Sequence, residues 1–365
     1  MKIALKLALI LGVLFLSSLS VFYFYKINTR NAVLEAVKER KIINILVAGN
    51  KNYDRHRHTF FAVISFNPEN NNIGVLFIPP KFKLLWDKEK NIFKRIEDIS
   101  LKEFDKLKLV LQEKLELNLS FYLELYSEDL KRVIDLLEGL EIFFLNKDQN
   151  YFFDLGINYL DGEKILKYIE TDSIFTTYDR IQDILLTLYQ KRNQKKFLAE
   201  LDFISFLISD FNSNLLPNEI LSLLDLILNQ GNLFFFTLPG EFDKENYFMD
   251  EIALNEYQEN FRNRIIMSDK AIPKIKVKIL NGTSIPKLAR KMRSNLIKEG
   301  ISIVEFGTFH EFKFSKSTIF CQKGDYNLAR KISDITGINK IYFKINNNIF
   351  SDCLIIVGKD FVGDF

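Results

Sequence analysis

The sequence predicts an α/β protein with three folded parts: an N-terminal transmembrane helix, an α/β/α sandwich and a small C-terminal α/β domain. Apolar strand-like runs alternate with amphipathic helical segments along most of the 365 residues, a pattern typical of a mixed sheet covered by helices. A long uncharged run opens the chain, and a separate strand–helix series closes it. We therefore expect a membrane anchor over residues 1–28, a stalk over 29–41, the sandwich over 42–262 and the last domain over 273–365.

The N-terminus predicts an uncleaved signal anchor. Lys2 and Lys6 precede an uncharged run over residues 7–25, which Lys26 ends. As a helix this run rises about 28 Å, close to the hydrocarbon thickness of a bilayer. Bulky aromatic residues at 22–25 disfavour a cleaved signal peptide, the alternative. We expect a single pass through the cytoplasmic (inner) membrane, with membrane lipid as a partner and the body of the protein on the extracytoplasmic side.

Charge and cysteine content narrow the function classes. A net charge of +3 gives no support to nucleic acid as a partner. The two cysteines, Cys321 and Cys353, fall in two expected strands of the last domain. They are either a pair of buried apolar thiols or, outside the cytoplasm, a disulfide. There is no ligand-spaced cluster of Cys and His, so no cofactor is expected from this composition.

The sandwich region contains unbroken apolar runs that read as buried strands. Helical periodicity, with apolar residues on one face, fills most of the space between them. The segment over residues 261–272 reads as a linker to the last domain. We expect strands at residues 42–48, 60–66, 73–78, 142–145 and 233–238, and helices at 101–117, 127–138, 178–197 and 214–228.

The last ninety or so residues carry the most specific pattern. A strand over residues 275–280 runs into the turn Asn281-Gly282-Thr283, and the final strand over 353–357 ends in Gly358-Lys359-Asp360-Phe361. Expected helices at 288–297 and 326–336 and strands at 301–306 and 318–321 lie between. This order resembles the C-terminal domain of LytR-type proteins, which opens on an LNGT-like turn and closes on GKDF-like residues.

The central region resembles the catalytic domain of the LytR–CpsA–Psr family. The segments that carry the resemblance are Ala62-Val63-Ile64-Ser65-Phe66-Asn67-Pro68, Leu76-Phe77-Ile78-Pro79, Tyr159-Leu160-Asp161-Gly162-Glu163-Lys164-Ile165-Leu166 and Leu238-Pro239-Gly240. The resemblance implies a membrane-anchored, outward-facing protein. Members of the family transfer glycopolymers from polyprenyl-pyrophosphate carriers to the cell wall.

The carboxylates that this chemistry requires do not carry over. The reaction needs acids to hold a divalent metal ion beside the pyrophosphate. Where the family pattern has three Asp residues, this chain has Lys51, Thr59 and Lys81. Lysine cannot hold Mg²⁺, and threonine holds it poorly without carboxylates. Asp54, in the same loop as Lys51, could stand in for one acid.

The arginines carry over only in part. Arg57 and Arg180 match the family's phosphate-binding arginines, whereas two partner arginines fall on Glu170 and Asp183. Together with Lys51, Arg57 and Arg180 are the candidate phosphate-binding residues. We expect Arg57 and Arg180 to face a shared cleft, and we expect no metal site.

A dense polar cluster, Arg55-His56-Arg57-His58, leaves three interpretations open. It could be a solvated basic loop, a contact to phosphate or to an anionic polymer, or a pair of histidine ligands on one side of an extended segment.

These observations favour a non-catalytic envelope protein, a pseudoenzyme that binds a lipid-linked or cell-wall glycan. The expected partners are a polyprenyl-pyrophosphate glycan or peptidoglycan, with no nucleic acid. The alternative is a glycopolymer phosphotransferase that acts on polyprenyl-pyrophosphate-linked polymer, and only this alternative calls for Mg²⁺. A third possibility, a transcriptional attenuator, has no DNA-binding motif to support it.

Overall fold

The computed structural model describes residues 31–50, 58–146, 153–170, 173–191, 212–229, 232–266 and 274–361. The expected anchor at residues 7–25 lies outside these ranges. Within the ranges, no helix is both long enough and apolar enough to cross a membrane.

A six-stranded mixed sheet forms the centre of the first part, in the order β10-β3-β2-β1-β6-β9. Its strands are β1 (Ile43–Asn50), β2 (Phe60–Asn67), β3 (Asn72–Phe77), β6 (Leu119–Tyr126), β9 (Asn212–Ser213) and β10 (Asn232–Thr237). β1 is antiparallel to β2 and parallel to β6, and all of its residues are buried. A strand that is covered on both faces needs an unbroken apolar run, and β1 has one.

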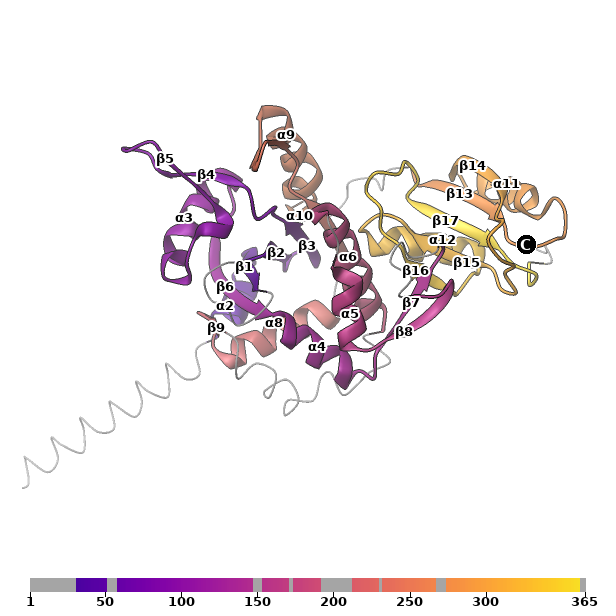
Figure 1. The fold of residues 1–365 in the computed structure, drawn as a ribbon, viewed down its shortest axis with the longest axis horizontal. Coiled ribbons are helices and arrows are strands. Elements are labelled where there is room, and N and C mark those ends of the chain that lie inside the picture. Colours follow the sequence, from indigo (N-terminus) through magenta and orange to yellow (C-terminus); the bar gives the residue numbers. More distant parts are fainter. Residues whose placement is uncertain are drawn as a thin grey trace, which may run out of the picture.

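Helices cover both faces of this sheet (Figure 1). We call the face that includes Ile45 and Val47 the inner face; α6 (Ile174–Lys191) and α8 (Pro217–Asn229) pack on it. The outer face packs against α3 (Phe104–Leu115) and against the run formed by α9 (Glu251–Tyr257), the π-helix Gln258–Arg262 and α10 (Asn263–Ile266). A β-carbon at Gly74 would lie 2.6 Å from Ile265 Cδ1, so only glycine lets this run pack so closely on β3.

Smaller elements border the sheet. Two short hairpins are β4 (Lys83–Asp87) with β5 (Ile92–Arg95) and β11 (Glu241–Asp243) with β12 (Asn246–Phe248). Two 3₁₀ turns, Ile96–Asp98 and Leu101–Glu103, precede α3. A third hairpin, β7 (Leu140–Phe144) with β8 (Gly156–Leu160), stands beside α4 (Ser127–Leu136) and α5 (Gly162–Ile169).

The expected stalk is not a free segment. Its helix, α2 (Ala32–Lys38), packs on α8 with Val33 fully buried. Asn31 caps the helix and its side-chain amide donates to Asn218 O at 3.2 Å, while Ala32 N donates to Glu219 Oε1 at 2.7 Å. Val33 of this short helix thus joins the hydrophobic core of the first part.

The C-terminal part is a five-stranded sheet in the order β14-β13-β17-β15-β16. Its strands are β13 (Lys276–Asn281), β14 (Ser302–Thr308), β15 (Thr318–Cys321), β16 (Ile341–Phe343) and β17 (Cys353–Val357). Two helices, α11 (Leu288–Lys298) and α12 (Tyr326–Thr336), contribute Met292, Leu296 and Ile332 to its core. The expected strand 318–321, helix 326–336 and strand 353–357 have the observed bounds.

Other sequence-based expectations differ from the structure as well. Strand β6, which pairs with β1 along its whole length, was not expected. β1 was expected to end before Gly49 but continues to Asn50. The expected linker at 261–272 is wrong over its first six residues, because the helical run continues to Ile266 and buries Phe261 and Ile265.

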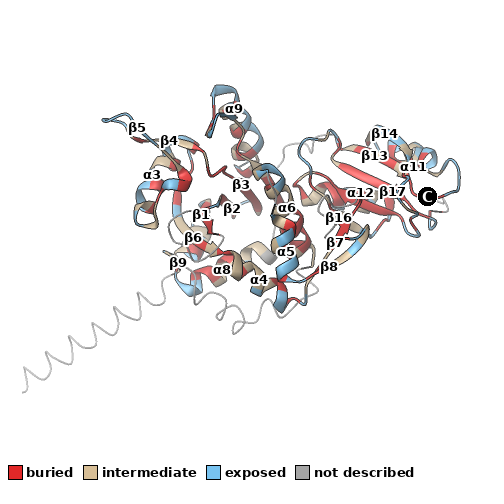
Figure 2. Ribbon diagram, in the orientation of Figure 1, coloured by how far each residue is buried: buried red, intermediate tan, exposed pale blue. Residues whose placement is uncertain are grey.

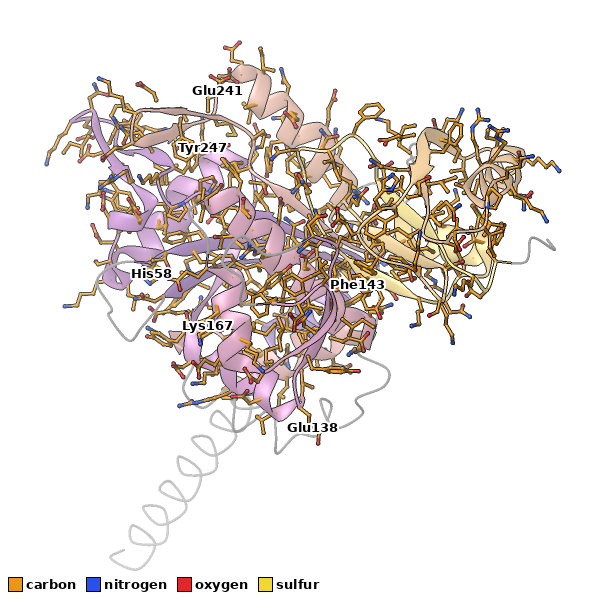
Figure 3. All side chains as sticks on the ribbon, turned by 45° about the vertical axis from the view of Figure 1, so that its right-hand side comes forward. His58, Glu138, Phe143, Lys167, Glu241 and Tyr247 are labelled. Atoms are coloured by element: carbon orange, nitrogen blue, oxygen red, sulfur yellow. The ribbon has the colours of Figure 1, made fainter. Side chains whose placement is uncertain are left out.

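The β7–β8 hairpin joins the two parts of the molecule. Figure 3 labels Phe143 of β7 at the boundary with the C-terminal part. Its ring lies 5.0 Å from those of Phe320 and Tyr342 and 5.7 Å from that of Phe314, measured between centroids. Tyr342 also donates to Glu141 Oε1 at 2.6 Å. Most of β7 is buried (Figure 2), and its Phe143 shares a buried cluster with Phe314 and Phe320, so the two parts share a packed interface.

Candidate functional site

The inner face of the central sheet carries apolar side chains that are only partly buried. Register places them in rows: Ile64 and Phe121 flank Ile45, Leu123 lies beside Val47, and Phe60 and Leu125 flank Gly49. Central strands of a covered sheet normally bury such residues fully, as the outer face does here with Leu46 and Val63. The five that keep accessible surface are Phe60, Ile64, Phe121, Leu123 and Leu125.

Helices α6 and α8 bring further half-buried apolar residues to the same core. They are Ile181 and Leu185 on α6, and Leu221 and Leu224 on α8. Both helices and the sheet thus contribute incompletely buried apolar residues to the same cluster. This surface has the chemistry to bind a hydrocarbon chain, because each Å² of apolar area removed from water contributes about 25 cal/mol.

Aromatic rings close one end of this region. Tyr178 of α6 stacks on Phe77 at 4.9 Å between centroids and meets Phe60 edge-on at 6.1 Å. Its hydroxyl donates to Ile78 O at 2.8 Å, and burial raises its pKa well above the usual value. Tyr178 is therefore a neutral residue that ties α6 to the end of β3.

Arg180, the candidate phosphate-binding residue that the structure describes, lies on a different side of α6. Its Nη1 donates to Tyr168 O at 2.5 Å, and its guanidinium lies 5.1 Å from the centre of the Tyr168 ring. Tyr168 O is one of the last four carbonyls of α5, which have no partner within the helix. A cation there also interacts favourably with the helix dipole. Arg180 therefore stabilises the end of α5.

The other candidates, Lys51 and Arg57, lie outside the described residues. The shared cleft of Arg57 and Arg180 thus stays a prediction. Thr59, at one of the positions where the family pattern has an acid, is exposed, and Lys81, at another, is half-buried. Over the ranges that the structure describes, no three His, Cys, Asp or Glu side chains lie close enough together to hold a metal ion. The donors that Mg²⁺ would need are not assembled there.

His58 is the one member of the polar cluster at residues 55–58 that the structure describes, and it is not solvated. It is fully buried against Phe61 and Phe104, on the outer side of the sheet (labelled in Figure 3). Its Nε2 lies 3.0 Å from Oε1 of Glu124, which is fully buried as well. Glu124 Oε2 accepts from the Tyr126 hydroxyl at 3.0 Å and from the Asn212 amide at 3.2 Å.

These contacts engage both oxygens of Glu124, which the sequence analysis did not single out. A buried carboxylate is tolerated only when it is paired, and here His58 supplies the partner. The pair fixes the start of β2 to β6, next to the end of β1. A histidine two residues before a buried strand was the one sequence signal that could have revealed it.

The side of α6 that carries Arg180 also binds the C-terminal part. Asp183 accepts from Ile345 N at 2.6 Å and from the Tyr168 hydroxyl at 2.5 Å, and Lys344 Nζ lies 3.1 Å from the same hydroxyl. One turn earlier, Asp179 accepts from the Asn347 amide at 2.7 Å. Asp183, which falls where the family pattern has an arginine, thus holds the C-terminal part in place.

Burial is the main cause of the shifted pKa values of the two carboxyls at this interface. It raises the pKa of Asp183 to about 7 and that of Asp179 to about 6, although Lys344 and the hydrogen bonds oppose the shift. Burial likewise lowers the pKa of Lys323, a nearby lysine of the C-terminal part. The docked arrangement therefore favours the protonated form of both carboxyls.

Comparison with known proteins agrees with this architecture. Residues 274–361 match the family model described as LytR cell envelope-related transcriptional attenuator. No curated protein matches the sequence. TagV of B. subtilis is 19% identical with a TM-score of 0.51, over 63% of this chain and 99% of that one. A putative transcriptional regulator of Bacillus subtilis, YwtF, is 17% identical with a TM-score of 0.50, over 62% and 92%.

YwtF has also been solved, as a LytR-CPS2A-psr family protein, with bound octaprenyl pyrophosphate lipid. Identities below 20% establish a common fold and not a common activity. Two expectations are confirmed by these comparisons: the likeness of the central region to this fold and the nature of the last domain. The central region therefore has the fold seen in TagV and YwtF, and residues 274–361 match the LytR family model.

Proposed function

We propose that this protein is anchored in the cytoplasmic membrane by residues 7–25, with its body on the extracytoplasmic side. There it binds a polyprenyl-pyrophosphate-linked or cell-wall glycan without transferring it. The observation that carries the proposal is the half-buried apolar inner face, Phe60, Ile64, Phe121, Leu123 and Leu125. A polyprenyl tail is a hydrocarbon, and these residues offer it apolar contacts between sheet and helices.

The fold supports the same ligand class. YwtF, which shares the fold, binds octaprenyl pyrophosphate. In the proposed complex Lys51 and Arg57 supply positive charge for the pyrophosphate, since both lie in the sequence between β1 and β2. The glycan beyond the pyrophosphate lies in solvent or against the wall.

We expect no transfer of the glycan because basic or neutral residues stand where a metal ion would need carboxylates. A lysine at position 51 stands where a divalent cation would need an acid, and Thr59 and Lys81 replace the other two. Two cations about 4 Å apart repel by several kcal/mol even at an intermediate dielectric. Metal occupancy is therefore low in the proposed site, and a lysine that contacts phosphate directly favours binding over turnover.

Lipid binding can be tested with one substitution and a matched control. The full chain in lipid nanodiscs is titrated with octaprenyl pyrophosphate. Leu123→Trp fills the inner face and should weaken binding at least tenfold. Leu109→Trp makes the same change at an exposed position on α3, 65% accessible, and should bind as the parent does. Equal binding by all three proteins would refute the inner face as the lipid site.

The same preparation separates binding from catalysis. With Mg²⁺ or Mn²⁺ present, we expect no phosphate release above background. If phosphate release depends on the metal and Arg57→Ala abolishes it, the phosphotransferase alternative would be established instead.

The proposed topology is tested separately. Protease added to intact spheroplasts should digest the C-terminal domain. A protected domain would contradict the proposed orientation.

A further inference from the structure

Cys321 and Cys353 face each other across two paired strands. They are direct partners in the antiparallel register of β15 and β17. The carbonyl of Cys321 accepts from Lys344 N at 2.9 Å, so its backbone groups point toward β16 and away from β17. Cys321 and Cys353 are therefore a non-hydrogen-bonded pair, the kind in which the α-carbons approach to about 4.5 Å. That separation lies within the range that a disulfide spans.

Both side chains lie on the same face of the sheet, because directly opposed residues of antiparallel strands share a face. Both are fully buried and are thiols in this structure. A hydrogen bond to the Cys321 sulfur and burial together raise the pKa of the Cys353 thiol. A protonated, buried thiol reacts slowly with oxidants, so the folded domain protects whichever redox state it acquired while folding.

We propose that Cys321 and Cys353 are a disulfide site, which closes when the C-terminal domain folds in the presence of a disulfide oxidant. One cysteine thiolate attacks the oxidant's disulfide and releases one of its thiols. The second cysteine thiolate then attacks the mixed disulfide and releases the other thiol. The two cysteines lose two protons and two electrons, and the oxidant's two sulfurs gain them.

Closure has a structural consequence at the boundary between the two parts. The Cys321 thiol donates to Lys323 O at 3.0 Å. The next residues dock on β10, where Phe235 N donates to Gly324 O at 2.6 Å, and on α10, where Arg264 forms an ion pair with Asp325. Oxidation removes the thiol proton from this loop and joins β15 covalently to β17. Two inert apolar thiols would do neither.

The experiment uses the full chain, which has two cysteines in all, so an intrachain disulfide has one possible connectivity. The chain is unfolded and reduced, then refolded by dilution into a glutathione redox buffer. The products are alkylated under denaturing conditions and weighed by mass spectrometry. We expect a monomer two hydrogen atoms lighter than the reduced chain, with no alkylation. Proteolysis should yield one linked pair of peptides that contains both cysteines.

Controls decide between this site and chance oxidation. Cys321→Ser and Cys353→Ser, each with one thiol, should give alkylated or glutathionylated chain. The oxidised parent should melt about 10 °C above its reduced form, and neither single variant should show a redox-dependent shift. Recovery of two alkylated thiols after oxidative refolding would overturn the proposal, as would disulfides between chains only. If refolding fails, the folded chain is oxidised just below its melting temperature and scored in the same way.

Discussion

The carboxyl of Asp183 makes the stability of this protein depend on pH in an unusual direction. Its pKa rises from 3.8 to about 7 in the folded chain, chiefly because of burial. The folded state therefore holds this proton more tightly than the unfolded state does. The corresponding stability is fully present below pH 3.8 and is lost as the pH rises through about 7.

The magnitude follows from the size of the shift. One pKa unit corresponds to 1.36 kcal/mol, so a shift of roughly three units amounts to about 4 kcal/mol. Solvent screening does not reduce this figure much, because Asp183 is only 1% exposed. Asn in place of Asp183 keeps an oxygen to accept from Ile345 N but cannot ionise. We therefore expect Asp183→Asn to gain up to about 4 kcal/mol relative to the parent between pH 4 and pH 8.

Urea denaturation of the full chain at both pH values measures this difference through the unfolding midpoint. Asp243→Asn, at an exposed position on β11, is the matched control and should leave the pH dependence of the parent unchanged. Hydrogen exchange of the peptide that contains Ile345 reports on the interface itself. If Asp183→Asn and the parent keep a constant difference from pH 4 to pH 8, the argument from burial is refuted.

Three further perturbations test the packing around the interface. Gly324→Ala places a β-carbon against Gln182 and should cost about 1–3 kcal/mol, whereas Gly307→Ala meets its nearest atom at 3.6 Å and should be close to neutral in urea titrations. Arg180→Gln removes the cation from the end of α5 and should cost about 1 kcal/mol, measured by thermal unfolding; no loss would argue against its structural role at Tyr168. Phe143→Ala should cost about 3–5 kcal/mol and expose the junction to limited proteolysis, and wild-type resistance would show that the hairpin does not join the two parts.

The sequence alone determined the elements whose signal is local. The C-terminal domain is the clearest case, because turn residues and helix-ending glycines mark its boundaries. Gly337 adopts φ +68° immediately after α12, where a left-handed residue is needed. Unbroken apolar runs likewise located β2, β3 and β10 to within a residue or two. For the same reason the family resemblance could be read from short motifs at strand ends.

The tertiary structure alone decided which residues meet. Strand β6 alternates polar residues (Ser120, Tyr122, Glu124) with apolar ones, unlike the more continuous apolar runs of β1 and β2. The burial of Glu124 depends on partners distant in sequence, among them His58, 66 positions away. In the sequence Asp183 looks like an ordinary acidic residue of a helix. Its role at the interface depends on the hydrogen bond from Ile345 N, 162 positions away. Local sequence carries propensity and periodicity, whereas burial, pKa and the partners of a charge depend on segments that only the folded chain brings together.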